Sequence, residues 1–121
     1  MPVSSGVRNR IKEFLDPDDE IQYVFPADIF GSTNPSVFFA VTRKTITVLS
    51  TGHWSRTTPK RVISVTLRNH RIGPVETGGN PWFKFNGIVY EIDDEYIAAV
   101  HAADAEISRN AAKPEDPLPD L

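Results

Sequence analysis

The residues of this chain that are best suited to chemistry are basic, and they are concentrated in one part of the sequence. Residues 29–75 contain no Asp or Glu but seven Lys and Arg residues, although the whole chain of 121 residues has a formal net charge of -3. Such segregation of charge can attract an anionic partner even to an acidic protein. The seven bases are Arg43, Lys44, Arg56, Lys60, Arg61, Arg68 and Arg71.

One group within this window combines bases with an aromatic ring. Trp54, Arg56, Lys60 and Arg61 lie close together in the sequence, and the surrounding residues 51–59 predict a loop. A loop tryptophan beside basic side chains can anchor a protein, a peptide or a membrane surface. We therefore take these four residues as the candidate site for binding an anion or a partner.

Sheet construction offers a simpler interpretation of the same residues. Strands and turns need basic side chains on their solvated side, and a loop tryptophan can fold back over the end of a barrel. In a meander, successive turns lie at opposite ends of the sheet, so Arg43 and Lys44 should share one end with Arg68 and Arg71. The group at residues 56–61 should then lie at the other end, which predicts two basic clusters rather than one.

The residue patterns of catalytic and metal sites are missing from the sequence. There is no cysteine, so disulfides and thiolate metal sites are excluded. His53, His70 and His101 are far apart, without the spacing of metal ligands. We therefore expect no catalytic residue, no metal and no cofactor. A small hydrolase or isomerase that uses His53 or His101 with a nearby acid remains a third hypothesis.

Composition also bears on partners and location. A pI of about 5.5 opposes general affinity for nucleic acid phosphates. No apolar run approaches the roughly 18 residues that a membrane span needs, and the first residues do not resemble a signal peptide. We therefore expect a cytoplasmic protein that binds no nucleic acid.

The periodicity of apolar residues predicts a mainly β domain between two helices. Ser4 and Ser5 can cap a first helix from about residue 7 to 16, and Asp93 or Asp94 can cap a last helix that ends by residue 112. Asn86-Gly87 between two apolar runs predicts a two-residue type I′ hairpin. We expect one domain at residues 7–112, an N-terminal arm at 1–6 and a disordered, acidic, proline-rich tail at 113–121. Strands are predicted at residues 21–25, 37–42, 45–50, 61–67, 72–76, 82–85 and 88–92.

Three segments within this order resemble the bacterial pleckstrin-homology-like (PH-like) domains. They are IKEFLDPDDEI at residues 11–21, FFAVTRKTITVL at 38–49 and KRVISV at 60–65, followed by the last helix. The resemblance covers roughly residues 7–110. It implies a seven-stranded antiparallel barrel with a short N-terminal helix and a C-terminal helix that caps the barrel. An OB-type barrel is a weaker alternative, because the last long element here is a helix.

The resemblance implies a non-catalytic interaction module. In eukaryotic relatives of the fold, phosphoinositides bind basic residues in the loop between the first two strands. The corresponding residues 26–36 contain no Lys or Arg and do contain Asp28, which argues against binding of inositol lipids. We therefore expect a protein or peptide partner, for which a groove between the last helix and a sheet edge could accept an added strand. Weak binding of anionic lipid head groups through Trp54, Arg56, Lys60 and Arg61 is the alternative.

Overall fold

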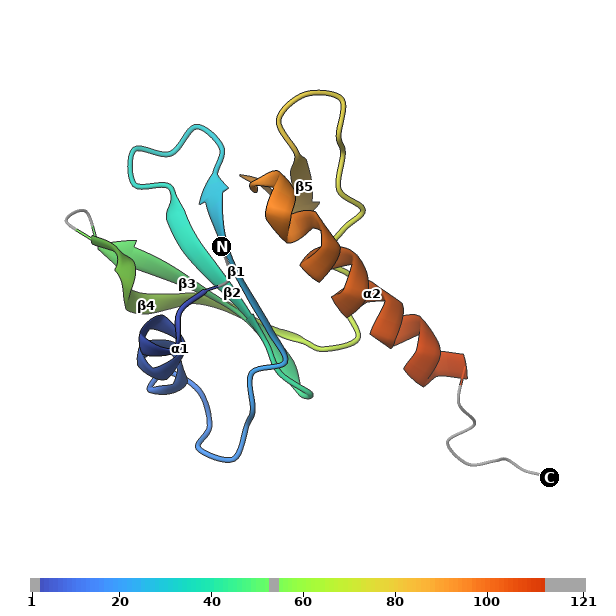
Figure 1. Ribbon diagram of the computed structural model, residues 1–121, viewed down its shortest axis with the longest axis horizontal. Helices are drawn as coiled ribbons and strands as arrows, with labels where there is room; N and C mark the ends of the chain where they lie inside the picture. The colour runs from blue at the N-terminus through green and yellow to red at the C-terminus, as the bar shows by residue number, and fades with distance from the viewer. Residues whose placement is uncertain (1–2, 53–54, 113–121) are drawn as a thin grey trace.

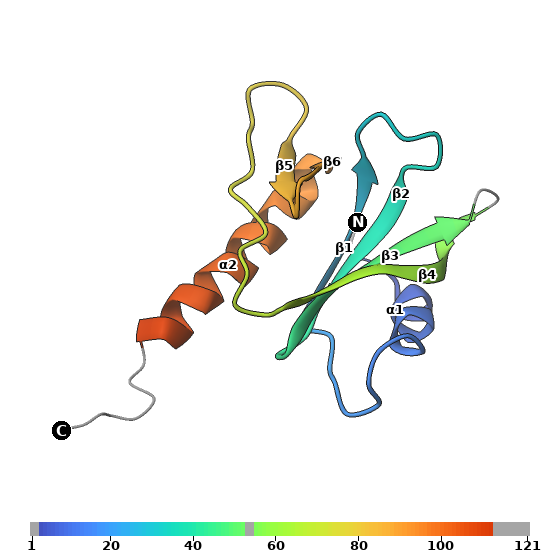
Figure 2. The same ribbon diagram turned by 180° about the vertical axis from the view of Figure 1, so that it is seen from behind.

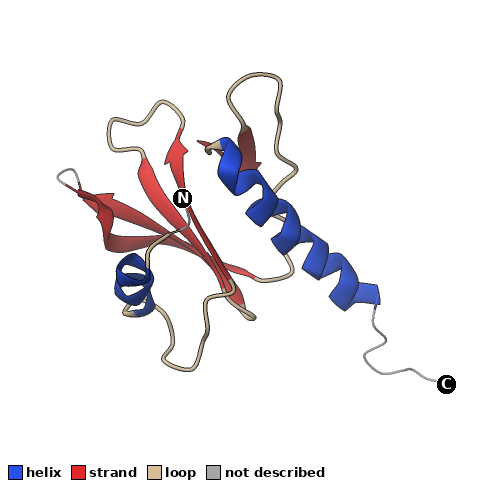
Figure 3. Ribbon diagram, viewed as in Figure 1, coloured by secondary structure: helices blue, strands red, loops and turns tan. Residues whose placement is uncertain are grey.

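One antiparallel sheet of six strands lies between two helices in the computed structural model, which describes residues 3–52 and 55–112 (Figure 1, Figure 3). Helix α1 spans Ser5–Lys12, and helix α2 spans Ile97–Ala112 after a short 3-10 turn, η1, at Asp94–Tyr96. The strands are β1 Tyr23–Ile29, β2 Ser36–Val41, β3 Thr45–Gly52, β4 Ser55–Leu67, β5 Trp82–Phe85 and β6 Ile88–Glu91. The prediction of a mainly β fold is confirmed.

The sheet is not closed and has six strands, so the prediction of a seven-stranded antiparallel barrel is wrong. Its strand order is β4-β3-β2-β1-β6-β5, with β4 and β5 at the two edges. The strand predicted at residues 72–76 is reduced to one isolated bridge between Glu76 and Trp82. Pro74 has no N–H for a strand ladder, and the N–H groups of Ile72 and Gly73 donate to the Asp104 carboxylate on α2 instead.

The inner face of the sheet forms an aromatic core beneath α2. The ring of Phe39 stacks on Phe25 with the centroids 5.1 Å apart, and it meets Phe83, Phe85 and Tyr90 edge-on at 5.4, 5.3 and 4.9 Å. Helix α2 packs here, with Val100 and Ala103 fully buried against the same cluster. Burial of these side chains is the main source of the stability of this face.

The opposite face of the sheet is covered by α1. Val7 and Ile11 of the helix pack on Val24, Phe38 and Leu49 of the first three strands. Every residue of β2 is therefore buried, because alternate side chains enter the two cores. Figure 2 shows the same arrangement from behind, with α1 on the side of the sheet away from α2.

Several local predictions are confirmed. Ser4 is the N-cap of α1, and its hydroxyl accepts a hydrogen bond from the N–H of Val7 at 3.3 Å. Asn86 and Gly87 have φ values of 52° and 82°, as the two positions of a type I′ turn require, and they join β5 to β6. The hairpin predicted at residues 37–50 is formed by β2 and β3.

Other boundaries differ from the prediction. Helix α1 ends at Lys12 rather than at residue 16, and β1 continues to Ile29 through Pro26. Strand β4 begins at Ser55, so the predicted loop at residues 51–59 is wrong apart from residues 53 and 54, which lie outside the described residues. Trp82, at the start of β5, is 39% exposed.

A polar cluster attaches α2 to the end of the sheet. Arg68, just after β4, donates through Nη2 to the carbonyl of Ala103 at 2.9 Å and lies 3.4 Å from Oε1 of Glu106. The hydroxyl of Tyr23 on β1 donates to the other oxygen of Glu106 at 2.9 Å. The helix is thereby fixed to both β1 and the segment after β4.

Neither helix in the described part of the chain has the length and apolar character that a bilayer span requires.

Burial of Tyr90 gives the fold an expected response to alkaline pH. The apolar surroundings raise the pKa of the Tyr90 hydroxyl above its ordinary value of about 10. Between the unfolded and folded pKa values the folded state binds more protons, so stability is complete below about pH 10 and falls as pH rises beyond it. We expect Tyr90→Phe to make this fall shallower in urea titrations at a series of pH values. An unchanged alkaline slope would contradict the assignment to Tyr90.

Candidate binding site

The predicted site residues that are described lie on β4 rather than in a loop. Arg56, Lys60 and Arg61 all belong to this edge strand and are exposed. Trp54 lies outside the described residues. The predicted division of the basic window is confirmed, because the N–H of Arg68 donates to the carbonyl of Lys44 at 3.1 Å, at the end of the sheet opposite to Arg56.

Arg56 is already engaged by a carboxylate. Its Nη2 atom donates to Oδ1 of Asp28 on β1 at 2.8 Å, with both side chains substantially exposed. An exposed pair of this kind is worth at most about 1 kcal/mol, but it offsets the charge of Arg56. Lys60 and Arg61 therefore keep the positive charge of the predicted cluster, and neither has an ion pair with another described residue.

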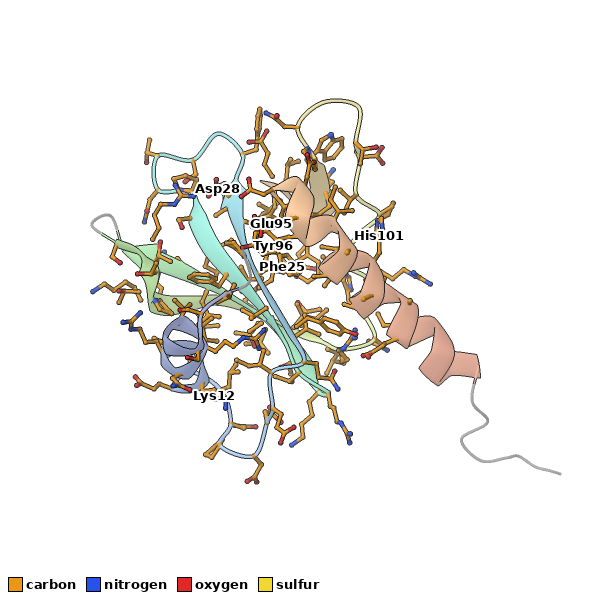
Figure 4. The ribbon with its side chains drawn as sticks, viewed as in Figure 1. Lys12, Phe25, Asp28, Glu95, Tyr96 and His101 are labelled. Carbon is orange, nitrogen blue, oxygen red and sulfur yellow. The ribbon has the colours of Figure 1, made fainter. Side chains whose placement is uncertain are left out.

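A groove of about 710 Å³ lies beside the Arg56–Asp28 pair. Its carboxylates come from β1, β6 and the turn into η1, namely Asp28, Glu91, Asp93 and Asp94. Figure 4 shows Asp28, Glu95 and Tyr96 together near this end of the sheet, where α2 begins. Arg56 is the one base among the described residues that line the groove, and four carboxylates line it as well, so this surface is acidic and disfavours an anionic ligand.

Sequence reasoning missed the acidic groove because its carboxylates are far apart in the chain. Strand β1 pairs with β6, which places Asp28 directly opposite Glu91. Like charges at opposed positions are unfavourable, and the ion pair with Arg56 relieves this repulsion. Within residues 3–52 and 55–112, no group of three His, Asp or Glu side chains is arranged to hold a metal ion.

The described histidines are not placed in a closed apolar pocket. His101 is exposed on the outer side of α2, as Figure 4 shows, beside a shallow hollow of about 290 Å³. The Asp104 carboxylate lines the same hollow, but its two oxygens accept the N–H groups of Ile72 and Gly73 at 2.9 Å each. His70 meets the ring of Phe85 edge-on at 5.2 Å. His53 lies outside the described residues.

The C-terminal half of β4 exposes a row of apolar side chains. Val65 and Leu67 are 61% and 71% exposed, and Val62 and Ile63 are each 37% exposed. Alternation in the strand predicted at residues 61–67 places Ile63, Val65 and Leu67 on one face. Because β4 is an edge strand and the core under α1 is formed by the first three strands, this half of β4 meets solvent.

A β-bulge increases the apolar surface of this row. Leu49 of β3 pairs with Val62, and Val48 pairs with Ser64, so Ile63 is the additional residue of β4. Val62 thus lies opposite Leu49, on the face of the sheet that α1 covers over the first three strands. The sequence signal for the site is the uninterrupted uncharged segment VISVTL at residues 62–67.

Comparison with known proteins gave no match: no family model fits the chain, and no curated protein or solved structure is similar to it.

Proposed function

We propose that the protein is a non-catalytic interaction module that binds a protein or peptide partner by adding its strand to the edge of β4. The observation that carries this proposal is the exposed apolar row at Val62, Ile63, Val65 and Leu67 on an unpaired edge strand. An extended peptide can satisfy the free backbone groups of such an edge while its side chains pack on the exposed row.

We also propose that the fold is PH-like, with one strand missing. The strand order β4-β3-β2-β1-β6-β5 and the helix that follows the last strand support this assignment. The single bridge between Glu76 and Trp82 also supports it, because Glu76 ends the segment predicted as the fifth strand. The sheet nevertheless bends toward closure, since its two ends come into contact. Nδ2 of Asn86 in the β5–β6 turn donates to Oγ1 of Thr66 on β4 at 2.9 Å.

The hydrogen bonds of β3 and β4 indicate which backbone groups a partner would meet. The N–H of Arg68 donates to Lys44, so residues 44 and 68 form a hydrogen-bonded pair. Such pairs alternate along an antiparallel ladder, so Thr66 and Ser64 bond toward β3, whereas Val65 and Leu67 direct their N–H groups outward. The carbonyl of Leu67 accepts from His70, which leaves Val65 as the centre of the free edge.

The second edge of the sheet is less suited to the same role. Strand β5 has only four residues, and Trp82 exchanges both of its backbone hydrogen bonds with Glu76, at 2.7 and 3.0 Å. We expected strand addition in a groove between the last helix and a sheet edge. The more accessible edge is β4, and its exposed apolar row lies on the face of the sheet opposite to that helix.

Selection of displayed random peptides against the full chain tests the proposal. We expect the enriched peptides to alternate apolar and polar residues. They should bind the Val65→Pro variant at least about tenfold more weakly. This substitution removes an N–H that points outward, so the hydrogen bonds between β4 and β3 are kept. Val65→Thr is the matched control, because it keeps the N–H and the β-branched shape. Thermal denaturation should show that both variants fold.

Two outcomes would overturn the proposal. In the first, the enriched peptides bind Val65→Pro as well as they bind the original chain. In the second, no peptide is enriched, but the chain sediments with anionic vesicles at low salt and loses this binding when Lys60 and Arg61 are both replaced by Gln. That result would favour the lipid alternative, in which each base contributes about 1 kcal/mol.

A further inference from the structure

The protection of the β4 edge against strand addition is concentrated in its first half, because the second half has only the bulge at Ile63. Natural edge strands are protected by proline, by lysine and by bulges. Pro59 and Lys60 lie in the first half of β4, and two of the three register irregularities with β3 involve Ser50 and Thr51, opposite Arg61 and Pro59. The second half, residues 62–67, contains no charge and no proline. The open part of the edge therefore begins directly after the two bases.

Lys60 and Arg61 lack a carboxylate partner among the described residues, unlike Arg56, Lys44 and Arg68. Arg56 pairs with Asp28, Lys44 lies 3.5 Å from Asp19, and Arg68 lies 3.4 Å from Glu106. Strands β2, β3 and β4 cannot supply a partner, because residues 29–75 contain no acid. The free edge thus presents an apolar segment that continues into two uncompensated positive charges.

We propose that the partner of β4 is an extended acidic segment, in which apolar residues on alternate positions are followed by carboxylates. This inference depends on the proposed function and specifies the partner. Antiparallel pairing is favoured for a single added strand. In that direction, the partner residues opposite Leu67 come first and those opposite Arg61 and Lys60 come last. Carboxylates at the C-terminal end of the partner segment would then meet both bases, and opposed unlike charges stabilise strand pairing.

Charge argues against a second copy of this chain as the partner. A two-fold axis at Ser64 would pair Ile63 with Val65 of the second copy, but it would place Lys60 opposite Arg68 of that copy. Like charges at opposed positions weaken strand pairing. In every antiparallel register, two paired β4 strands would contain Lys60 and Arg61 twice, and neither strand has an acid to pair with them.

Three synthetic peptides of defined order test the inference with the full chain. The first is Ac-SVTVTVSEE-amide, the second is its rearrangement Ac-EESVTVTVS-amide, and the third is Ac-SVTVTVSKK-amide. Titrations followed by NMR amide shifts give the dissociation constants. We expect the first peptide to bind about tenfold more tightly than the third, because two cross-strand ion pairs replace two repulsions. It should also bind more tightly than the second.

Variants of the chain connect this preference to the two bases. Replacing Lys60 and Arg61 by Glu should reverse the order of the first and third peptides, and Val65→Pro should weaken all three. Added salt should reduce the difference between the acidic and basic peptides. The first peptide should shift the amide signals of residues 61–67 most.

The possible failures are distinguishable. Equal binding of the three peptides, all weakened by Val65→Pro, would overturn the acidic partner but leave strand addition intact. Binding that is insensitive to Val65→Pro, or absent for all three peptides, would overturn both. Sedimentation velocity supplies the remaining outcome: a dimer of the original chain that Val65→Pro dissociates would replace the acidic segment by a second copy.

Discussion

Phe39→Ala should lower the free energy of unfolding by about 3–5 kcal/mol, the usual cost of removing a fully buried ring. The side chain of Phe39 is completely buried at the centre of β2. Its ring contacts four other aromatic rings, which belong to β1, β5 and β6. The substitution therefore removes apolar contact with both halves of the sheet at once, and the surrounding rings cannot all close the cavity.

Urea denaturation followed by tryptophan fluorescence and circular dichroism measures this loss. Single domains have stabilities of about 5–15 kcal/mol, so Phe39→Ala could leave part of the population unfolded. Phe39→Leu keeps most of the volume and should cost less, about 1–2 kcal/mol, which gives a measurable series. Phe30→Ala is the matched control, because Phe30 is 66% exposed and the change there should be within about 0.5 kcal/mol. Similar losses for Phe39→Ala and Phe30→Ala would contradict the described core.

Local patterns predicted those elements whose cause is local. Ser4 caps α1 through its own hydroxyl, and Asn86-Gly87 adopts the positive φ values of its turn whatever the rest of the chain does. The two strands on either side of the tight turn at Arg43-Lys44 likewise predicted a hairpin. These features depend on neighbouring residues, so they can be recognised without knowing the fold.

The errors concern features that depend on distant residues. Residues 72–76 have the composition of a strand, but Ile72 donates its N–H to Asp104, which is 32 positions away, rather than to a neighbouring strand. Residues 55–59 resemble a loop, yet they continue β4 because β3 extends far enough to pair with them. Tertiary pairing outweighs local propensity in both segments.

The candidate site was predicted only in part for the same reason. The sequence placed Lys60 and Arg61 at one end of the sheet and showed that no acid is near them in the chain. It could not show that Asp28 on β1 would form an ion pair with Arg56. It also could not show that β4 would be an edge, which decides whether Val65 meets solvent or a core. Strand order is a property of the whole fold, and the functional proposal depends on it.

The segment after β4 depends on one buried carboxylate, and removing it should have the second large effect. Asp104 on α2 is only 7% exposed and accepts the N–H groups of Ile72 and Gly73 at 2.9 Å each. Asp104→Ala would leave both donors without their carboxylate acceptor, and the N–H of Ile72 is buried. Hydrogen bonds to a charged group contribute about 1.5–3 kcal/mol, and buried donors left unpaired are costly. We expect a loss of about 3 kcal/mol in the free energy of unfolding.

The size and location of this effect can be checked separately. Asp104→Asn keeps one acceptor oxygen and should cost roughly half as much as Asp104→Ala. Asp18→Ala makes the same chemical change at an exposed turn residue and should be nearly neutral. Amide hydrogen exchange at Ile72 and Gly73 should accelerate more in Asp104→Ala than exchange in β2, because the local contact is lost while the sheet persists. Unchanged protection at Ile72 would mean that Asp104 does not hold this segment on α2, and the missing fifth strand would need another cause.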